Sequence, residues 1–449
     1  MKKNISPARI YAYKILYDVL SNGAFSNISV SRHLISLKDE NDRRLAVQIV
    51  YGTIKKKNRL SRIISDLSDI SRGNIDKKVH IILMMSLYQL LFLDKTPAYA
   101  VVNDAVNLTR TNAGERSSSF VNAVLRNASR KRDELNLQTD NFEERMFLDY
   151  GFSDFELDIL RKRFSGCDEA AERYAVHAQS APPLYLRVNT LKISADGLIS
   201  EFEKISVSAE KTYVSEIIKI NTTDNIFASD LYKKGYFFAQ DISGALSTQV
   251  LDPQKGDLII DLCAAPGAKS FGAAIASGNT QVLACDINAK KLEIVKRSAL
   301  QLGVSVRTLR RDAFSVRSGE EGLYDRVICD VPCSGLGVIA RKPEILYNLT
   351  PEHIKYLIES QQKIIRAAFS YLKVGGILVY STCTINRDEN EKTAESLLAE
   401  FSNAAPDEIK LKSVLRSSHP EMKDGMLFLT PEQDECDGFF TAKIKKVRA

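Results

Sequence analysis

The sequence predicts an α/β protein with a doubly wound, mostly parallel sheet, preceded by an all-helical region. From about residue 257 onward, short apolar strand patterns alternate with helical patterns, which is typical of strands joined by crossover helices. From residue 6 to about residue 130, the apolar residues keep only helical spacing. Between these regions, strand and short-helix signals are mixed up to about residue 238.

The chain has 449 residues, which is enough for two or three domains with cores of their own. We expect four parts along the chain. They are an all-α domain over residues 1–130, a helical connector over 131–175, a small α+β subdomain over 176–240 and the doubly wound domain over 241–449.

Composition and charge exclude several classes of protein. The longest uncharged run, residues 79–93, is shorter than the roughly 20 residues that span a membrane, and no secretory signal follows Met1. The seven cysteines form no C-x-x-C pair, and the five histidines, His419 among them, show no ligand spacing. We therefore expect a reduced, cytoplasmic protein without a metal and without membrane contact.

Residues 1–150 hold 24 Lys+Arg and 16 Asp+Glu, a net charge of +8, whereas the rest of the chain holds −2, which indicates a polyanionic partner of the helical region or a merely solvated basic surface. Residues 79–93 are apolar nearly all round and should form the central helix of a bundle. Arg43, Arg44 and the basic run 55–59 are the expected contacts to a polyanion such as RNA. In the small subdomain, Arg187 and Asn189 are expected to face RNA as well.

Two strands of the doubly wound region end in reactive side chains. The strand at 327–329 runs into Asp330, Pro332 and Cys333, and the strand at 376–380 ends in Ser381-Thr382-Cys383-Thr384. Ligands bind beyond the carboxyl ends of strands in open α/β sheets. We therefore expect one carboxylate and two thiols to meet at one edge.

A third strand leads into a turn of small residues before a helix. These residues are Cys263, Ala264, Ala265, Pro266, Gly267, Ala268 and Lys269. Small residues let a ligand approach the backbone, and a helix N-terminus favours an anionic group. A cofactor with a carboxylate, such as S-adenosylmethionine, suits this turn. Asp286 and Asp312 follow the next two strands and are the expected contacts to its ribose and adenine.

These motifs resemble those of RNA cytosine-5 methyltransferases. The resemblance rests on Asp261–Lys269, Asp330–Gly335, residues 337–345 and Ser381–Thr384. Residues 42–126 resemble the NusB-like RNA-binding domain, through Asp42-Arg43-Arg44, residues 86–91, 96–103 and 120–126. Together they resemble the RsmB/Sun group, which methylates a cytidine of 16S ribosomal RNA. That resemblance implies a class I, Rossmann-like methyltransferase domain behind a NusB-like one, with no protein partner evident.

The resemblance also implies a role for each site residue. Cys383 is the nucleophile that adds to carbon 6 of cytosine, Asp330 hydrogen-bonds the base and borders the cofactor, and Cys333 assists release of the product. Ala268 stands where the family has glycine, which would be unfavourable if that position needs a positive φ. Two alternatives stay open: a transfer RNA cytosine-5 methyltransferase, and a non-catalytic RNA-binding or assembly factor.

Overall fold

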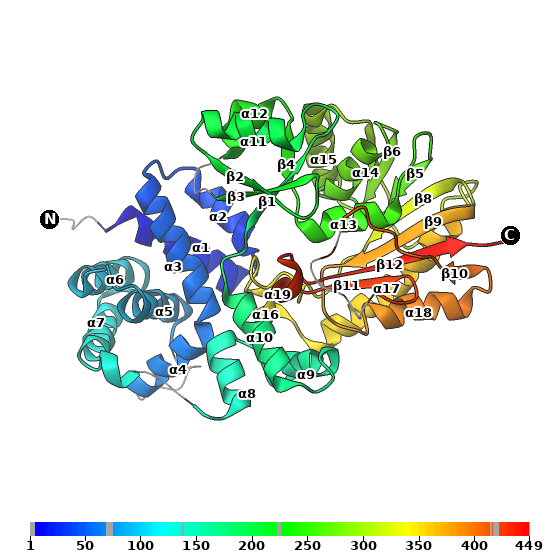
Figure 1. Ribbon diagram of the computed structural model, residues 1–449. Coiled ribbons are helices and arrows are strands. Elements are labelled where there is room, and N and C mark those ends of the chain that lie inside the picture. Colours follow the sequence, from blue (N-terminus) through cyan, green and yellow to red (C-terminus); the bar gives the residue numbers. More distant parts are fainter. Residues whose placement is uncertain are drawn as a thin grey trace. The chain divides into compact units, whose positions relative to one another are not determined.

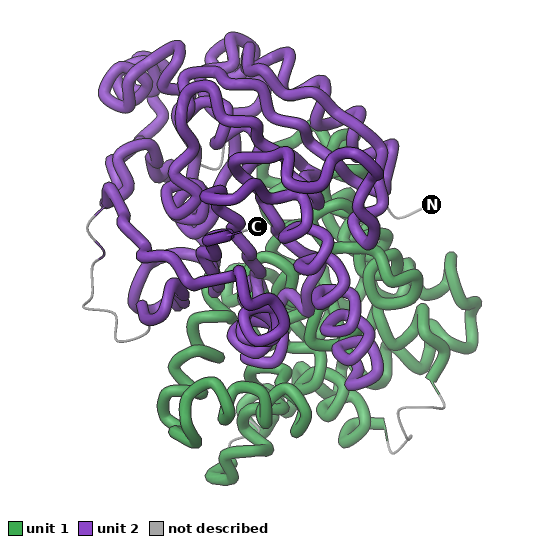
Figure 2. Tube along the Cα trace, turned by 90° about the vertical axis from the view of Figure 1, so that its right-hand side faces the viewer, with its two compact units in different colours: residues 1–180, 339–349 green, residues 181–338, 350–449 purple. Residues whose placement is uncertain are grey.

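The computed structural model describes residues 5–68, 75–135, 139–221, 226–413, 415 and 422–448. The chain forms two compact units. Unit 1 comprises residues 1–180 with 339–349, and unit 2 comprises residues 181–338 with 350–449 (Figure 2). Each unit is described by itself. His419 lies outside the described residues.

Unit 1 is helical, as the sequence predicts for its first 130 residues. Its helices are α1 (Pro7–Asn22), α2 (Ser26–Leu34), α3 (Glu40–Lys55), α4 (Lys57–Ser68), α5 (Lys77–Phe92), α6 (Ala98–Ala113), α7 (Glu115–Arg130), α8 (Phe142–Arg145), α9 (Asp154–Arg163), α10 (Asp168–Gln179) and α16 (Ile345–Asn348). A 3-10 turn at Arg132–Leu135 and a π-helical turn at Met146–Tyr150 complete it.

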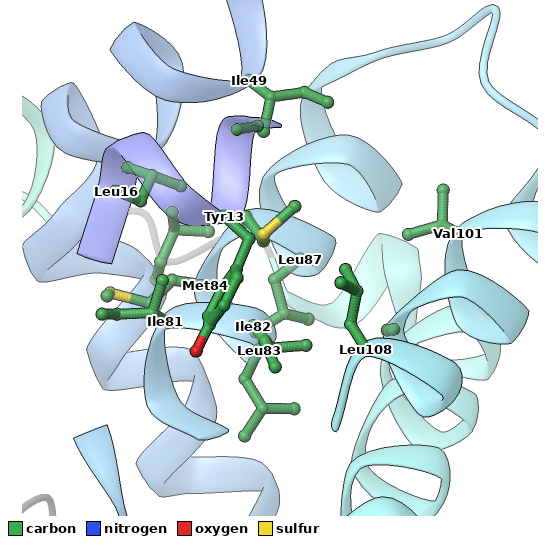
Figure 3. Packing of buried hydrophobic residues seen from close by; sticks show 14 of the residues in the cluster. Tyr13, Leu16, Ile49, Ile81, Ile82, Leu83, Met84, Leu87, Val101 and Leu108 are labelled. Carbon is green, nitrogen blue, oxygen red and sulfur yellow. The ribbon is translucent and has the colours of Figure 1, made fainter. Parts of the chain in front are cut away.

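Helix α5 is central to this unit, which confirms the prediction from its apolar sequence. Ile81, Ile82, Leu83 and Met84 are all buried, and Figure 3 shows them packed with side chains of α1, α3 and α6. Each such side chain stabilises the fold by about 1.5–3 kcal/mol. The helix starts where the Asp76 carboxylate accepts the amide hydrogens of the next turn.

Basic side chains of the run at 55–59 bond to other residues of unit 1. Lys55 Nζ donates to the carbonyls of Gln179 and Ser180 at 2.9 and 2.8 Å, and burial lowers the pKa of Lys55 to about 8. Lys56 Nζ donates to the Asp149 carbonyl, and Arg59 pairs with the Asp149 carboxylate at 2.5 Å. The expectation that these three cations bind RNA is therefore wrong, because residues 139–180 fold back over them.

The start of unit 2 is a four-stranded antiparallel sheet in the order β2-β3-β1-β4. Its elements are β1 (Leu184–Val188), β2 (Ser208–Lys211), β3 (Ile217–Asn221), β4 (Phe237–Ala239), α11 (Ala195–Lys204), α12 (Asp230–Lys233) and a 3-10 turn at Ile226–Ala228.

Arg187 and Asn189 do not face solvent, so the expectation that they contact RNA is wrong. Both are buried, at 2% and 0% exposure. Arg187 Nη1 donates to Gln240 Oε1 and Thr248 Oγ1, and Asn189 Nδ2 donates to the carbonyls of Gly235 and Leu302. A buried polar side chain needs such partners, so both residues join the small sheet to helices of the same unit.

The rest of unit 2 is the doubly wound sheet, in the order β10-β12-β9-β8-β5-β6-β7, with β11 paired to β12 (Figure 1). Its strands are β5 (Ile259–Asp261), β6 (Val282–Asp286), β7 (Val306–Arg310), β8 (Tyr324–Asp330), β9 (Leu372–Thr382), β10 (Ala404–Pro406), β11 (Met426–Leu429) and β12 (Phe439–Lys446). Its helices are α13 (Ile242–Leu251), α14 (Ala268–Ala276), α15 (Ala289–Leu302), α17 (Pro351–Tyr371), α18 (Glu391–Glu400) and α19 (Pro431–Asp434).

Strands β5 to β9 run parallel and β12 runs antiparallel to β9, which confirms the predicted fold class. Helices α13, α14 and α15 cover one face, and α17 and α18 the other (Figure 1). The chain passes from β5 outward to β6 and β7, and then returns to β8 on the other side of β5. The strand order therefore reverses between β5 and β8, and ligands of such sheets bind at this point. Among the described helices, none is long and apolar enough to cross a membrane.

Candidate active site

Four acids follow consecutive parallel strands. Asp261, Asp286 and Asp330 are the last residues of β5, β6 and β8, whereas Asp312 lies two residues beyond the end of β7. The paired registers bring the ends of these strands to one edge of the sheet. The structure therefore places at one edge the residues that the sequence motifs single out.

The turn after β5 packs closely against a side chain of the helix that follows it. Gly267 has φ +110°, and a Cβ at this position would lie 2.4 Å from the Phe271 ring. Ala268 is already the first residue of α14 and has no positive φ. The alanine that departs from the family pattern therefore costs nothing, because the strained position is Gly267 itself.

Asp286 ties the end of β6 to this turn. Its Oδ2 accepts the Ala265 amide hydrogen at 3.3 Å, and its Oδ1 accepts that of Asn288 at 2.8 Å. Asp312 is exposed, and its Oδ1 accepts the Phe314 amide hydrogen at 2.9 Å. Each carboxylate oxygen has two lone pairs, so both acids keep acceptor capacity after holding their own turns.

Asp261 is buried and Cys263 half-buried beneath the turn. Asp261 Oδ2 accepts the Ser270 hydroxyl at 2.6 Å, while its Oδ1 has no hydrogen-bond partner within the described part of the chain. Burial raises the pKa of Asp261 to about 7. Burial also raises the pKa of the Cys263 thiol well above its ordinary value, so Cys263 is a neutral small side chain here.

Asp330 is held from two sides. Lys269 Nζ, on the first turn of α14, lies 2.7 Å from Asp330 Oδ2, and the Ser381 hydroxyl donates to Oδ1 at 2.7 Å. Asp330 and Ser381 are paired in the register of β8 and β9. About a third of the Asp330 side chain stays exposed, so the carboxylate is fixed in direction and still accessible.

Cys333 and Cys383 meet just beyond these strand ends. Their sulfur atoms lie 3.3 Å apart, although the residues are 50 positions apart in sequence. Contact with Cys383 and burial raise the pKa of the Cys333 thiol well above its ordinary value. The Cys333 thiol therefore keeps its proton at neutral pH.

A buried carboxylate that the sequence did not single out lies behind the two cysteines. Glu389 has 0% exposure and accepts the Ser334 amide hydrogen at 2.8 Å and the Ser334 hydroxyl at 2.6 Å. In the sequence it belongs to the charged run Asp388-Glu389-Asn390-Glu391, which is typical of a solvated helix start. No feature of that run indicates that one of its members points inward.

The described residues contain no cluster of three or more metal-ligating side chains. They do contain groups that fit a methyl donor with amino, carboxylate and ribose groups. These groups are the spare acceptors of Asp286 and Asp312 and the unpartnered oxygen of Asp261.

Comparison with known proteins agrees with this architecture. Residues 248–445 match the family model described as 16S rRNA methyltransferase RsmB/F, and residues 6–130 match the NusB family. The chain carries a NusB-family domain followed by a methyltransferase domain of the RsmB/F family. The resemblance expected from the motifs is therefore confirmed.

Relatives match along the whole chain. The "Probable ribosomal RNA small subunit methyltransferase B" of Synechocystis sp. is 29% identical, covering 98% of this chain and 99% of that protein. The protein of the same name in Bacillus subtilis is 29% identical, covering 99% of this chain and 100% of that protein.

Solved structures share the fold. One superposes with a TM-score of 0.83, covering 98% of this chain and 99% of that chain at 22% identity. A methyltransferase homolog protein from Pyrococcus horikoshii superposes with a TM-score of 0.58 at 26% identity, covering 69% of this chain and 100% of that chain.

Proposed function

We propose that this protein transfers a methyl group from S-adenosylmethionine to carbon 5 of a cytidine in small-subunit (16S) ribosomal RNA. The observation that carries the proposal is the pair of sulfurs of Cys333 and Cys383, 3.3 Å apart and next to Asp330. The family description and the names of the full-length relatives support ribosomal RNA as the substrate.

The first step is attack by Cys383. Carbon 5 of cytosine is a poor nucleophile, and addition of the Cys383 thiolate to carbon 6 makes carbon 5 enamine-like. Asp330 accepts a hydrogen bond from the amino group of the base, and one from the ring nitrogen once that nitrogen has taken a proton from solvent; this proton neutralises the charge of the adduct and returns to solvent on release. Lys269 and Ser381 hold the Asp330 carboxylate in place for this role. The base must leave its stack to reach the site.

S-adenosylmethionine supplies the methyl group as an electrophilic sulfonium. We expect residues 263–269 to bind the donor, with Asp286 at the ribose, Asp312 at the adenine and Asp330 bordering the donor on the β8 side. The unpartnered Oδ1 of Asp261 and the spare acceptors of Asp286 support this location.

Release needs loss of the carbon-5 proton. In the adduct Cys383 is a thioether without charge, so the Cys333 thiol ionises more easily and gives its proton to solvent. The Cys333 thiolate then takes the carbon-5 proton, the carbon-5 to carbon-6 double bond re-forms, and the bond from carbon 6 to Cys383 breaks. Both sulfurs return to their starting states.

The first test is transfer of labelled methyl from S-adenosylmethionine to deproteinised small-subunit rRNA, followed by nucleoside analysis. Labelled 5-methylcytidine is expected, and Cys383→Ala should abolish it while leaving donor binding intact. Near-normal turnover of Cys383→Ala would contradict the role of this residue. Label on transfer RNA alone would make that RNA the substrate, and no label on either RNA or on small subunits would favour a non-catalytic factor.

The second test concerns Cys333. Cys333→Ala should accumulate a covalent protein–RNA adduct, seen as a slow, denaturant-resistant band on a gel, because Cys383 still attacks and is no longer released. Normal turnover without such a band would mean that Cys333 has another role.

A further inference from the structure

Glu389 is the centre of a hydrogen-bond network behind the two cysteines. Four donors reach its carboxylate, and each lies within 3.1 Å. We call Glu389 and these contacts the Glu389 network; its other members are Ser334, Thr384, Gln361 and Asn386. A fully buried carboxylate is costly unless it is saturated with hydrogen bonds in this way.

The Glu389 network joins the two loops that carry the cysteines. Ser334 follows Cys333 directly, and both its amide and its hydroxyl donate to Glu389. Thr384 follows Cys383 directly, and its hydroxyl lies 2.7 Å from that of Ser334. The residue next to each sulfur is therefore fixed to the other loop.

The network is also fixed to the rigid part of the domain. Gln361 Nε2, from α17, donates to Glu389 Oε1 at 3.0 Å and to the Pro332 carbonyl at 2.9 Å. The Tyr380 hydroxyl, from β9, donates to the backbone carbonyl of Glu389 at 2.6 Å. Both loops are thus held to helix α17, through the buried Gln361, and to strand β9.

We infer that Glu389 is a positioning residue: it holds the Cys333 loop against the Cys383 loop and so sets the geometry from which the product is released. This inference rests on the proposed function. Glu389 touches neither sulfur in any contact described, so it acts through Ser334 and Thr384. Glu389 itself forms and breaks no covalent bond during the reaction.

Glu389 also acts on the Cys333 thiol through its negative charge. The titratable groups that face the Cys333 thiol are Cys383, Glu389 and Tyr380, and the first two raise its pKa together with burial. A thiol with a raised pKa keeps its proton in the resting site, and its thiolate is the stronger base for the carbon-5 proton.

The decisive variant is Glu389→Gln, which keeps the shape and removes the charge. The matched control is Glu156→Gln in unit 1. Glu156 is also buried, at 2% exposure, and it likewise accepts the amide and the hydroxyl of one serine, Ser153. Loss of stability common to buried glutamates will appear in both variants.

We expect Glu389→Gln to transfer methyl in the first turnover within about threefold of wild type. Its steady-state turnover should fall by about 10²-fold, as for a small misplacement of reacting groups, and the protein–RNA adduct should accumulate. Glu156→Gln should show neither effect. If Glu389→Gln slowed the first turnover and steady state equally, without an adduct, the role would be structural only and the inference would be overturned.

A second readout needs no RNA. The pH profile of the reaction of Cys333 with iodoacetamide, followed by mass spectrometry of the free protein, should move to lower pH in Glu389→Gln. An unchanged profile in a folded variant would overturn the inference. Should wild type transfer no methyl group, the proposed function fails, and this profile still decides the role of Glu389.

Ser334→Ala serves if Glu389→Gln does not fold. It removes the hydroxyl contacts to Glu389 and Thr384 and keeps the amide contact and the charge. A weaker accumulation of the same adduct is expected, and wild-type release would overturn the inference.

Discussion

At the scale of single residues, neighbouring acids in this site differ because their surroundings differ. Asp330 is ion-paired to Lys269 and partly exposed, whereas Asp261 is fully buried with one oxygen unpartnered within the described residues. Burial disfavours the charged form, so the pKa of Asp261 rises to about 7 from its ordinary 3.8. The same residue type thus serves as a fixed charge at one strand end and as a neutral carboxyl at another.

This difference predicts how stability depends on pH. Between the unfolded pKa of 3.8 and the folded pKa of about 7, the folded protein binds the Asp261 proton more tightly than the unfolded chain. The contribution of this proton to the free energy of unfolding is therefore complete below the unfolded pKa. It is lost as pH rises to the folded pKa, by up to about 1.4 kcal/mol per pH unit. In urea unfolding, the stability of wild type relative to Asp261→Asn should fall from about pH 5 to about pH 7 and stay constant above that pH.

Asp325→Asn is the matched control. Lys373 pairs with Asp325 at 3.0 Å, and the pKa of Asp325 is lowered, by hydrogen bonds from Leu258 and Lys373 that outweigh its burial. Its contribution is present above its unfolded pKa and is lost only as pH falls below it, so this variant should show no change between about pH 5 and about pH 8. A flat difference for Asp261→Asn as well would contradict the prediction.

The residue scale also shows what the sequence can reveal. Asp330, Cys333 and Cys383 could be singled out because each follows a strand pattern, and parallel strands end at one edge. Glu389, Arg187 and Lys55 could not be read correctly, because each is a charged residue in a polar run whose partners are distant in sequence. Burial of a charge depends on which segment folds over it, and spacing within one segment carries no such information.

At the scale of elements, the turn between β5 and α14 lets the helix start directly after the strand, at the expected donor site. The helix can begin at Ala268 only because Gly267 adopts φ +110° against the Phe271 ring. The strand-and-helix rhythm and the six main strands were predictable from the sequence. Short strands β10 and β11 were not, because three or four residues carry too little pattern.

Gly267→Ala should weaken both the fold and donor binding. The new Cβ would meet the Phe271 ring at 2.4 Å, and that ring is only 3% exposed, so it cannot move without repacking. We expect a loss of stability well above the roughly 1 kcal/mol of a positive φ alone. Affinity for S-adenosylmethionine, measured by calorimetry, should fall at least about tenfold.

Gly256→Ala is the control that separates the cost of a positive φ from the cost of the contact with Phe271. Gly256 has φ +91° in the same unit, with nothing within 4 Å of an added Cβ. It should lose about 1 kcal/mol and keep donor binding. Equal effects of the two variants would mean that the Phe271 contact is irrelevant, and Gly267→Ala with Phe271→Ala should recover part of the affinity.

At the scale of the whole molecule, the chain builds separate cores. The core of unit 1 gathers around α5, and in unit 2 buried clusters pack against both sheets. The segment 339–349 belongs to unit 1 although it lies within the methyltransferase half of the sequence. Its Glu344 accepts the Ser26 amide hydrogen at 2.8 Å, a pairing of residues 318 positions apart that no local pattern indicates.

Separate cores predict separate responses to core mutations. Leu83 in α5 and Leu378 in β9 both have 0% exposure, and truncation of either to alanine should cost about 2–5 kcal/mol. We expect Leu83→Ala to speed hydrogen exchange in unit 1, measured by mass spectrometry, while S-adenosylmethionine affinity stays within about twofold. Leu378→Ala should speed exchange in unit 2 and weaken donor binding. If Leu83→Ala sped hydrogen exchange equally in both units, the prediction would be wrong. Lost packing in unit 1 would then destabilise unit 2 as well, which means that the two units unfold together.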